Sequence, residues 1–210
     1  MRLFMTPVTI VLLLLLAACD TAVVETENSD NNIGVMLETT AGIIELEVYP
    51  DRAPLSAGSF LAFVDGGHLD GAGFYRTVSP ENDNGSPVIS VIQGGLLGEE
   101  EVLPSVAHET TEDTGLLHLD GVISLARGAP GTASGGAFFI CIGDQPALDF
   151  GGQRNPDGQG FATFGRVVKG MDVVHDIHQR DASAPTESEY MRGQLLTEVV
   201  EIVKARRTRP

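Results

Sequence analysis

The 210-residue chain contains no tryptophan, only two cysteines and few basic residues. Its 13 lysines and arginines face 29 aspartates and glutamates, which gives a formal net charge of −16 at pH 7. This charge repels a phosphate backbone, so the sequence argues against nucleic acid as a partner. No lysine or arginine lies between Arg76 and Arg127, an interval that holds nine acidic residues. The interval is either a solvated acidic face or a rim that favours cationic partners.

The first 18 residues have the pattern of a secretory signal peptide. Arg2 precedes an apolar run over residues 8–18 that only Thr9 interrupts. This run is shorter than the roughly 20 residues of a permanent transmembrane helix. Its end, Leu-Ala-Ala-Cys, resembles the bacterial lipobox, in which the cysteine is lipidated and becomes the first mature residue. We therefore expect Cys19 to carry lipid, such as palmitate, and to anchor the chain to a membrane; the alternative is an ordinary signal peptide that contains a cysteine.

Residues 19–32 begin with this cysteine and predict a flexible acidic linker, because they are polar and show no periodicity. The expected location is the bacterial cell envelope, with the domain facing the periplasm or the exterior. The choice between inner and outer membrane stays open, as does the oligomeric state. Cys141 has no second free thiol with which to form an intramolecular disulfide. It lies in an apolar run over residues 138–142, which predicts a buried small side chain rather than a nucleophile.

Residues 33–204 have the patterning of one folded domain, and residues 205–210 are expected to form a basic tail. Short runs rich in β-branched residues, separated by Gly, Pro, Asp and Asn, predict strands. These runs are residues 35–39, 43–49, 73–78, 88–93, 121–126, 137–142, 161–168 and 195–203. Apolar residues at helical spacing predict one helix that starts at Pro54 and a second over residues 171–178. The order of these elements indicates a mainly β fold, an antiparallel sheet closed as a barrel and accompanied by two helices.

No segment has a convincing metal-binding pattern. Residues 155–160 space oxygen ligands as a calcium loop does, but Arg166 stands where that loop needs a glutamate. The histidine pairs lack the spacing and the cysteine or acidic partners of a zinc site. The sequence also contains no nucleophile elbow and no phosphate-binding glycine loop. It therefore predicts no metal and no cofactor.

Six ordered motifs resemble those of one known family. They are GFYRTV at residues 73–78, VIQGG at 91–95, GVISLA at 121–126, GGAFFI at 135–140, LD at 148–149 and FGRV at 164–167. In this order they resemble the cyclophilin-type peptidyl-prolyl cis-trans isomerases over residues 35–202, essentially the whole predicted domain. The resemblance implies a closed eight-stranded antiparallel barrel capped by two α-helices. It also implies isomerase (rotamase) activity on proline-containing segments of unfolded or exported proteins, and so a role in protein folding.

The resemblance further implies the roles of individual residues. Arg76 matches the family's catalytic arginine, which donates to the prolyl nitrogen, and Gln93 matches the residue that orients this arginine or holds the substrate backbone. Rotation about the imide bond faces a barrier of about 18–20 kcal/mol. A donor whose hydrogen bond strengthens only in the twisted state lowers that barrier. The positions that match the substrate pocket are Val91, Ala126, Arg127, Ala137, Phe139, Leu148 and Phe161, with Phe139 as the floor under the proline ring.

Several positions depart from the family pattern. The loop over residues 79–88 is longer, and Ser90 and Val91 replace phenylalanine and methionine. The family's Asn, Gln, Trp and His correspond here to Arg127, Ala137, Ala147 and Phe161. Several hydrogen bonds to the substrate are therefore missing, which weakens uniform binding and raises KM; whether Phe161 restores apolar contact with proline stays open. We expect a slow or narrowly selective isomerase, and the alternative is a catalytically weak module that binds proline peptides or holds unfolded chains.

Overall fold

The structure is a computed structural model that describes residues 31–97 and 102–208. The predicted signal peptide of residues 1–18, the expected lipidation site Cys19 and the linker up to residue 30 lie outside the described residues. In the part of the chain that is described, no helix is long and apolar enough to cross a membrane.

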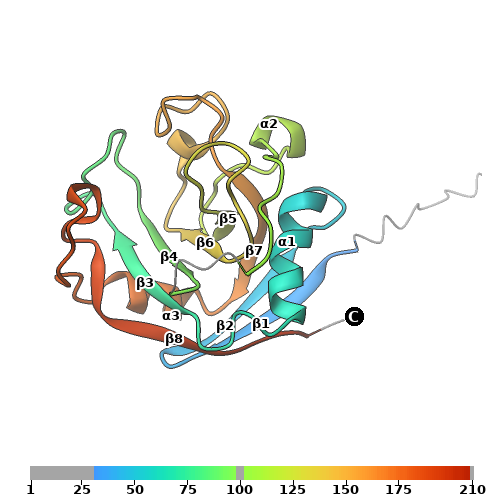
Figure 1. Cartoon of the computed structure of the whole chain (residues 1–210), viewed down its shortest axis with the longest axis horizontal. Coiled ribbons are helices and arrows are strands. Elements are labelled where there is room, and N and C mark those ends of the chain that lie inside the picture. The colour runs from blue at the N-terminus through green and yellow to red at the C-terminus, as the bar shows by residue number, and fades with distance from the viewer. Residues whose placement is uncertain (1–30, 98–101, 209–210) are drawn as a thin grey trace, which may run out of the picture.

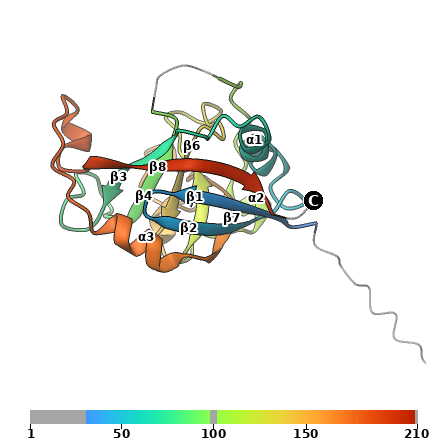
Figure 2. The same ribbon diagram turned by 90° about the horizontal axis from the view of Figure 1, so that it is seen from below.

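Eight antiparallel strands close into a barrel, which confirms the predicted fold (Figure 1). The strands are β1 (Ile33–Thr39), β2 (Gly42–Val48), β3 (Gly73–Val78), β4 (Val91–Gly95), β5 (Val122–Leu125), β6 (Ala137–Cys141), β7 (Ala162–Lys169) and β8 (Leu195–Arg207). Around the barrel their order is β1-β2-β7-β5-β6-β4-β3-β8, and β8 pairs with β1 to complete the ring. Seen from below, β8, β1 and β2 run side by side (Figure 2). Closure removes the sheet edges to which another chain could add a strand.

The β1–β2 hairpin shows how the sequence sets the strand pairing. Thr39 pairs with Gly42, and the two residues between them form the turn. The Thr39 hydroxyl donates to the Gly42 carbonyl at 2.7 Å and accepts from the Ala41 N–H. Gly42 has a φ of 139°, a conformation that glycine adopts without strain. Alternate residues such as Val35 and Leu37 are then fully buried, which fixes the register.

Two helices cover the barrel, as predicted. Helix α1 (Pro54–Asp65) begins at a proline, which suits a first helical turn, and packs against β7 and β8. Helix α3 (Met171–His178) buries Val174 and Ile177 and packs against β2, β3 and β4. Figure 1 shows α1 on the right of the barrel, and Figure 2 shows α3 at the lower left, beside β2.

Three short helices were not predicted. They are α2 (Thr111–Thr114) and the 3₁₀ helices η1 (Pro146–Leu148) and η2 (Glu189–Met191). Helices this short do not present a full apolar stripe, so hydrophobic periodicity does not reveal them. Helix α2 depends instead on a capping box, in which the Thr110 hydroxyl accepts from the Asp113 N–H and the Asp113 carboxylate accepts from the Thr110 N–H.

Apolar side chains form two separate clusters. The larger one fills the barrel and includes Phe60, Phe74, Phe138 and Phe164, all fully buried. The smaller cluster contains Val78, Ile89, Val91, Phe139, Cys141 and Leu148. Successive residues of a strand point to opposite faces, so Phe138 belongs to the interior and its neighbour Phe139 to the smaller cluster. Cys141 is buried, as predicted, and burial raises the pKa of its thiol.

Most strand boundaries lie within two residues of the prediction, and two differ by three residues or more. Strand β4 begins three residues later than expected, because residues 88–90 still belong to the irregular connection that contains the lengthened loop. Strand β8 extends to Arg207, so the first three residues of the predicted basic tail of residues 205–210 belong to the sheet. Arg207 pairs with Val35 of β1, and its guanidinium forms an ion pair with Asp65. These long-range contacts extend the strand, and the local charge pattern does not reveal them.

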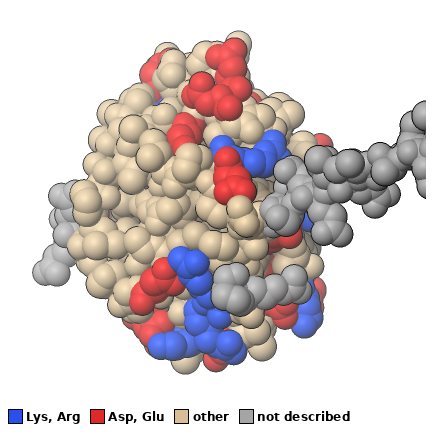
Figure 3. Space-filling model, turned by 90° about the vertical axis from the view of Figure 1, so that its right-hand side faces the viewer, with Lys and Arg blue, Asp and Glu red and all other residues tan. Residues whose placement is uncertain are grey.

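Basic side chains near the end of β8 have acidic partners. Lys204 pairs with Asp70, Arg206 with Glu38 and Arg207 with Asp65, at 2.7, 3.1 and 2.6 Å. Figure 3 shows the face on the right of Figure 1, where basic and acidic residues lie beside one another in small groups. Exposed pairs of this kind contribute little to stability. The few cations of the chain are therefore interspersed with its many acids on this face.

Candidate active site

A pocket of about 300 Å³ lies beside the smaller apolar cluster. Its walls are Arg76, Ile89, Val91, Gln93, Ala126, Arg127, Gly128, Phe139, Leu148, Arg154, Asn155, Phe161 and Tyr190. A larger depression of about 460 Å³ is lined by Arg180, Asp181, Thr197 and Glu198. That depression offers no apolar side chain for a proline ring, whereas Phe139, Leu148 and Phe161 line the pocket of about 300 Å³, which is therefore the candidate site.

The structure brings together eight of the nine predicted site residues. The eight in the pocket are Arg76, Val91, Gln93, Ala126, Arg127, Phe139, Leu148 and Phe161. Ala137, predicted to bind substrate, is not among the lining residues. It begins β6, where its carbonyl accepts from the Ala126 N–H at 2.9 Å, and its side chain ends at Cβ. The functional roles of the eight stay predictions.

Arg76 lies on β3 and is 9% exposed. Its Nη1 donates to Gln93 Oε1 at 2.8 Å, and its Nε and Nη2 donate to Gln194 Oε1 at 3.0 and 2.6 Å. Both acceptors are neutral amides, and no ion pair among the described residues involves Arg76. A guanidinium has five N–H donors, so two of them, one on each terminal nitrogen, are left for a ligand. Among the described residues, no carboxylate therefore offsets the positive charge of Arg76 at the pocket.

Gln93 is itself held in a fixed orientation. It is the direct partner of Arg76 in the pairing of β3 with β4. Its Nε2 donates to the Tyr75 hydroxyl at 2.9 Å, which leaves Oε1 to face Arg76. Burial raises the pKa of Tyr75, so this hydroxyl stays neutral. The strand register and the tyrosine together present an oxygen to the guanidinium.

Two phenylalanines at right angles form the apolar side of the pocket. Phe139 is 5% exposed, and its ring centre lies 5.3 Å from that of Phe161 at an interplanar angle of 88°. Leu148 is fully buried in the same cluster. Phe161 is thus placed where it can contact a proline ring bound against Phe139.

Arg127 lines the pocket, but its guanidinium is fully engaged within the protein. Nε and Nη2 donate to the Gly160 carbonyl, Nη1 donates to the Gly128 carbonyl, and both terminal nitrogens donate to the Asp157 carboxylate. These bonds use all five N–H groups. The guanidinium lies 5.3 Å from the centre of the Phe161 ring. Arg127 therefore supports Phe161, and no donor remains for a substrate.

The segment of residues 155–160, which spaces oxygen atoms as a calcium loop does, binds an arginine in this structure. The hydrogen bond from Arg127 lowers the pKa of Asp157 to about 2. Across the described residues, no three His, Cys, Asp or Glu side chains are grouped to hold a metal ion.

A buried histidine lies behind Phe139. His118 Nδ1 is 2.8 Å from Asp149 Oδ1, and its Nε2 is 3.1 Å from Ser124 Oγ. The three side chains have the order of a hydrolase triad, but His118 is 1% exposed and Ser124 is fully buried, so a substrate does not reach them. The imidazole stacks on Phe139, with ring centres 5.9 Å apart and planes 10° apart. Its role is to support the pocket floor.

Acidification is expected to destabilise the fold through His118. Burial lowers the pKa of His118, although the Asp149 carboxylate acts in the opposite direction. Below the unfolded pKa of about 6.5, the unfolded chain takes up a proton that the folded chain does not. The stability contributed by neutral His118 is therefore complete above that pH and is lost as the pH falls toward the folded pKa.

The measurement is the melting temperature from about pH 7.5 to about pH 5, across the ordinary histidine pKa. The parent is expected to lose more stability over this range than His118→Gln, which has no imidazole to protonate. His175→Gln, on the exposed side of α3, serves as the control and should follow the parent. Equal slopes for the parent and His118→Gln would contradict this role.

The pocket region also contains residues that were not predicted: Ile89, Gly128 and Asn155 are among its walls, and three others bind Arg76 or the lengthened loop. Tyr190 and Gln194 lie in the segment before β8, and Arg154 follows η1. Gln194 is fully buried, whereas Tyr190 is 48% exposed and its ring centre lies 5.1 Å from Cζ of Arg76. All three lie outside the family motifs and outside any periodic segment, Tyr190 in the short helix η2, so neither periodicity nor resemblance points to them. The one available signal was Tyr190, a lone aromatic residue in a polar segment.

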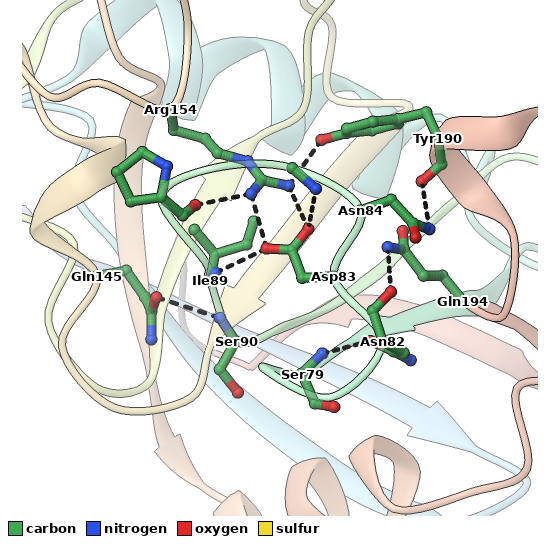
Figure 4. A network of polar contacts seen from close by, with 12 residues as sticks. Ser79, Asn82, Asp83, Asn84, Ile89, Ser90, Gln145, Arg154, Tyr190 and Gln194 are labelled. Carbon is green, nitrogen blue, oxygen red and sulfur yellow. Dashed lines mark hydrogen bonds and ion pairs between the residues drawn. The ribbon is translucent and has the colours of Figure 1, made fainter.

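The lengthened loop of residues 79–88 is tied to this side of the pocket (Figure 4). Asp83 and Arg154 form a bidentate ion pair at 2.7 and 2.8 Å, with side chains 0% and 3% exposed. Arg154 also donates to the Pro87 carbonyl and to the Tyr190 hydroxyl. Burial acts to raise the pKa of Asp83, but hydrogen bonds from Arg154 and from backbone N–H groups outweigh it and hold that pKa below its usual value. The insertion is therefore anchored through a buried charge pair.

Known proteins share the sequence pattern of this chain. The family model described as cyclophilin type peptidyl-prolyl cis-trans isomerase/CLD matches residues 34–206. Peptidyl-prolyl cis-trans isomerase A of Dickeya dadantii (strain 3937) is 36% identical over 148 residues, which cover 69% of this chain and 70% of that protein. Peptidyl-prolyl cis-trans isomerase cyp18 of Streptomyces antibioticus is 34% identical over 147 residues, which cover 68% of this chain and 81% of that protein.

Solved structures share the fold. The crystal structure of a cyclophilin type peptidyl-prolyl cis-trans isomerase of Cryptosporidium parvum matches with a TM-score of 0.62 at 18% sequence identity, covering 85% of this chain and 99% of that chain. A structure of the same protein in the presence of the dipeptide Ala-Pro matches with a TM-score of 0.59 at 19% identity, covering 82% and 96%. Because the family model extends from β1 to β8, the chain belongs to the cyclophilin-type peptidyl-prolyl cis-trans isomerase family.

Proposed function

We propose that the chain is a peptidyl-prolyl cis-trans isomerase that assists the folding of exported proteins in the bacterial cell envelope. The observation that carries this proposal is Arg76, a buried cation with two free donors at the edge of an apolar pocket. Phe139 and Phe161 give that pocket the surface a proline ring requires. Family membership supports the same reaction, and the signal-like N-terminus with Cys19 supports the location.

The reaction is a rotation about the imide bond with no covalent intermediate. Amide resonance sets a barrier of about 18–20 kcal/mol. As the bond twists, the prolyl nitrogen becomes pyramidal and its lone pair becomes a hydrogen-bond acceptor. A bond from Arg76 to this lone pair is stronger in the twisted state than in either planar isomer, so it lowers the barrier. The apolar rings exclude water from the pocket, which strengthens this interaction.

The pocket is expected to hold the peptide backbone weakly. Ala137 does not line it, and the N–H groups of Arg127 are all engaged within the protein. Weak uniform binding raises KM and leaves kcat unchanged. We therefore expect an isomerase with a high KM or a narrow choice of substrate.

A second candidate is a module that binds proline peptides, or holds unfolded chains, with little turnover. The observation that favours it is this shortage of free donors at the pocket. In this case the apolar side of the pocket would still take a proline ring, and Arg76 would contribute to affinity alone.

The exchange of an X-Pro tetrapeptide series separates the two candidates. The full-length chain, purified in mild detergent, is assayed at several concentrations, and peptide binding is measured by titration with the same series. An isomerase raises the exchange rate in proportion to its concentration, above an uncatalysed exchange that takes roughly tens to hundreds of seconds. Binding without any acceleration would identify the second candidate.

Replacing Cys19 by alanine is expected to move the chain from the membrane fraction to the soluble fraction, because a lipid anchor then has no attachment site. The measurement is fractionation of bacterial cells, together with the intact mass of the purified chain. Cys141→Ala changes the other cysteine, which is buried in the domain, and should leave the fractionation unchanged. A Cys19→Ala chain that stays in the membrane fraction, or a parent mass without added lipid, would show that Cys19 is not the anchor.

A further inference from the structure

We propose that Gln194 is a positioning residue for Arg76: it fixes the guanidinium without neutralising its charge, while the Tyr190 ring covers the guanidinium. This inference rests on the proposed isomerase function and concerns the same site. Both residues lie outside the motifs that identify the family. Four features of the structure support their roles. These are the contacts of the Gln194 amide, the position of the Tyr190 ring, the attachment of the loop of residues 79–88 and the uncompensated charge of Arg76.

Gln194 is oriented by contacts at both ends of its amide. It is fully buried, and its Oε1 accepts from two nitrogens of Arg76. Its Nε2 donates to the Asn82 carbonyl at 2.8 Å, so the oxygen end must face the arginine. Gln93 holds the remaining terminal nitrogen, Nη1. The two amides therefore restrain the guanidinium within its own plane.

The Tyr190 ring adds a further contact to the guanidinium of Arg76. The ring centre lies 5.1 Å from Cζ of Arg76, within the range of a cation–π contact. The Tyr190 hydroxyl accepts from Arg154 at 2.9 Å, and the Tyr190 carbonyl accepts from the Asn84 side chain at 3.2 Å. The hydroxyl and the main chain of Tyr190 are thus both held, which fixes the ring beside Arg76. The ring limits the approach of water to one side of the guanidinium.

The lengthened loop of residues 79–88 attaches the segment that carries both positioning residues (Figure 4). The Asn82 side chain donates to the Gly193 carbonyl at 2.9 Å, and the Asn84 side chain donates to the Arg192 carbonyl at 2.8 Å. A departure from the family pattern thus holds the groups that orient the catalytic arginine.

Gln194 holds Arg76 through a neutral amide, without a counter-charge. Three arginines line the pocket in the described structure, and two of them are paired with aspartates: Arg127 with Asp157 and Arg154 with Asp83. In both of these arginines, an aspartate of the protein offsets the positive charge. Arg76 differs because amide oxygens hold it, so its charge acts undiminished on a ligand in a region of low dielectric.

The main test is Gln194→Glu, with kcat and KM for X-Pro exchange measured on the full-length chain in detergent. The glutamate keeps the length of the side chain and an oxygen beside Arg76 but forms an ion pair with it. We expect kcat to fall at least about tenfold, with KM close to that of the parent. A role limited to holding Arg76 predicts unchanged kcat, because an arginine–carboxylate pair holds at least as firmly as an amide. The glutamate also loses the bond from Nε2 to the Asn82 carbonyl, a loss that the control variant reproduces at the Ile142 carbonyl. Parent-like turnover in Gln194→Glu would overturn the proposal.

Gln145→Glu is the matched control. Gln145 is also buried, accepts from the Ser90 N–H through Oε1 and donates to the Ile142 carbonyl through Nε2. The control therefore introduces the same chemical change in a similar setting, away from Arg76. We expect it to affect the melting temperature and not kcat. A loss of kcat equal to that of Gln194→Glu would show that any buried charge disturbs the pocket.

Tyr190 is tested by two variants. Tyr190→Ala removes the ring and is expected to lower kcat about tenfold, whereas Tyr190→Phe keeps the ring and most of the turnover. Phe150→Ala, at another exposed aromatic residue that does not line the pocket, should leave kcat unchanged. Equal activity of Tyr190→Ala and the parent would exclude the covering role.

A spectroscopic readout keeps this inference separate from the proposed function. The Nε–H proton of Arg76 donates to Gln194, so its exchange with water should be slow in the parent and in Gln145→Glu. Gln194→Met, which lacks the acceptor, should make this exchange fast in ¹⁵N–¹H spectra. If the parent binds peptides without turnover, the proposed function fails while these spectra still test the positioning. Fast exchange in the parent, or slow exchange in Gln194→Met, would refute the positioning even if the parent is an active isomerase.

Discussion

Replacing Arg76 by alanine is expected to lower kcat for X-Pro exchange by about 100- to 1,000-fold, with a much smaller change in KM. Arg76 donates to a lone pair that exists only in the twisted state, so its loss removes stabilisation of the transition state rather than of the bound peptide. The proline ring would still bind beside Phe139 and Phe161. The measurement is steady-state exchange of a tetrapeptide series, with the melting temperature of each variant as a check on folding.

Arg76→Lys separates charge from geometry. Lysine keeps a positive charge but lacks the planar set of donors that Gln93 and Gln194 fix in position, so we expect it to recover only part of kcat. The control is Arg166→Ala, which removes an exposed arginine of β7 that pairs with Glu47 and should leave both constants unchanged. An Arg76→Ala variant with the kcat of the parent would show that the reaction does not depend on this donor.

The strands and the apolar side of the site could be predicted because they follow from the alternation of side chains along each strand. Alternation along a strand separates Phe138 from Phe139 whatever the rest of the chain does. The motifs then place Arg76 and Gln93 on neighbouring strands, and their pairing brings the two side chains together. In such cases a short stretch of sequence determines which face a residue occupies. The fold and most of the pocket therefore followed from the sequence.

The parts of the site that could not be predicted depend on contacts that irregular segments make with distant parts of the chain. Gln194 meets Arg76 across 118 positions of the chain, and Arg154 meets Asp83 across 71. Loops such as these have no period, and their positions follow from specific hydrogen bonds. The same reason explains Arg127, which was predicted to bind substrate although its donors are taken up by neighbouring loops.

Replacing Asp83 by alanine is expected to destabilise the folded chain by about 3–5 kcal/mol, because it leaves the Arg154 guanidinium buried without its counter-charge. The same change removes the acceptor for the backbone N–H groups of Gly85 and Ile89. The measurement is the free energy of unfolding from denaturant titration at neutral pH. Asp176→Ala, which breaks an exposed pair with Arg180, is the control and should change this free energy little.

The double variant Asp83→Ala with Arg154→Met removes both charges and should be more stable than Asp83→Ala alone, because an unpaired buried cation costs more than a missing pair.

The parent should keep the contribution of this pair down to the ordinary carboxyl pKa of 3.8, since the folded pKa of Asp83 lies below that value. The contribution is then lost as the pH falls toward the folded pKa. Loss of the pair should also loosen the loop, whose Asn82 and Asn84 side chains hold the segment of Tyr190 and Gln194, and so lower kcat through Arg76. An Asp83→Ala chain as stable as the parent would mean that the Pro87 carbonyl and the Tyr190 hydroxyl suffice for Arg154, and the loop would then need another anchor.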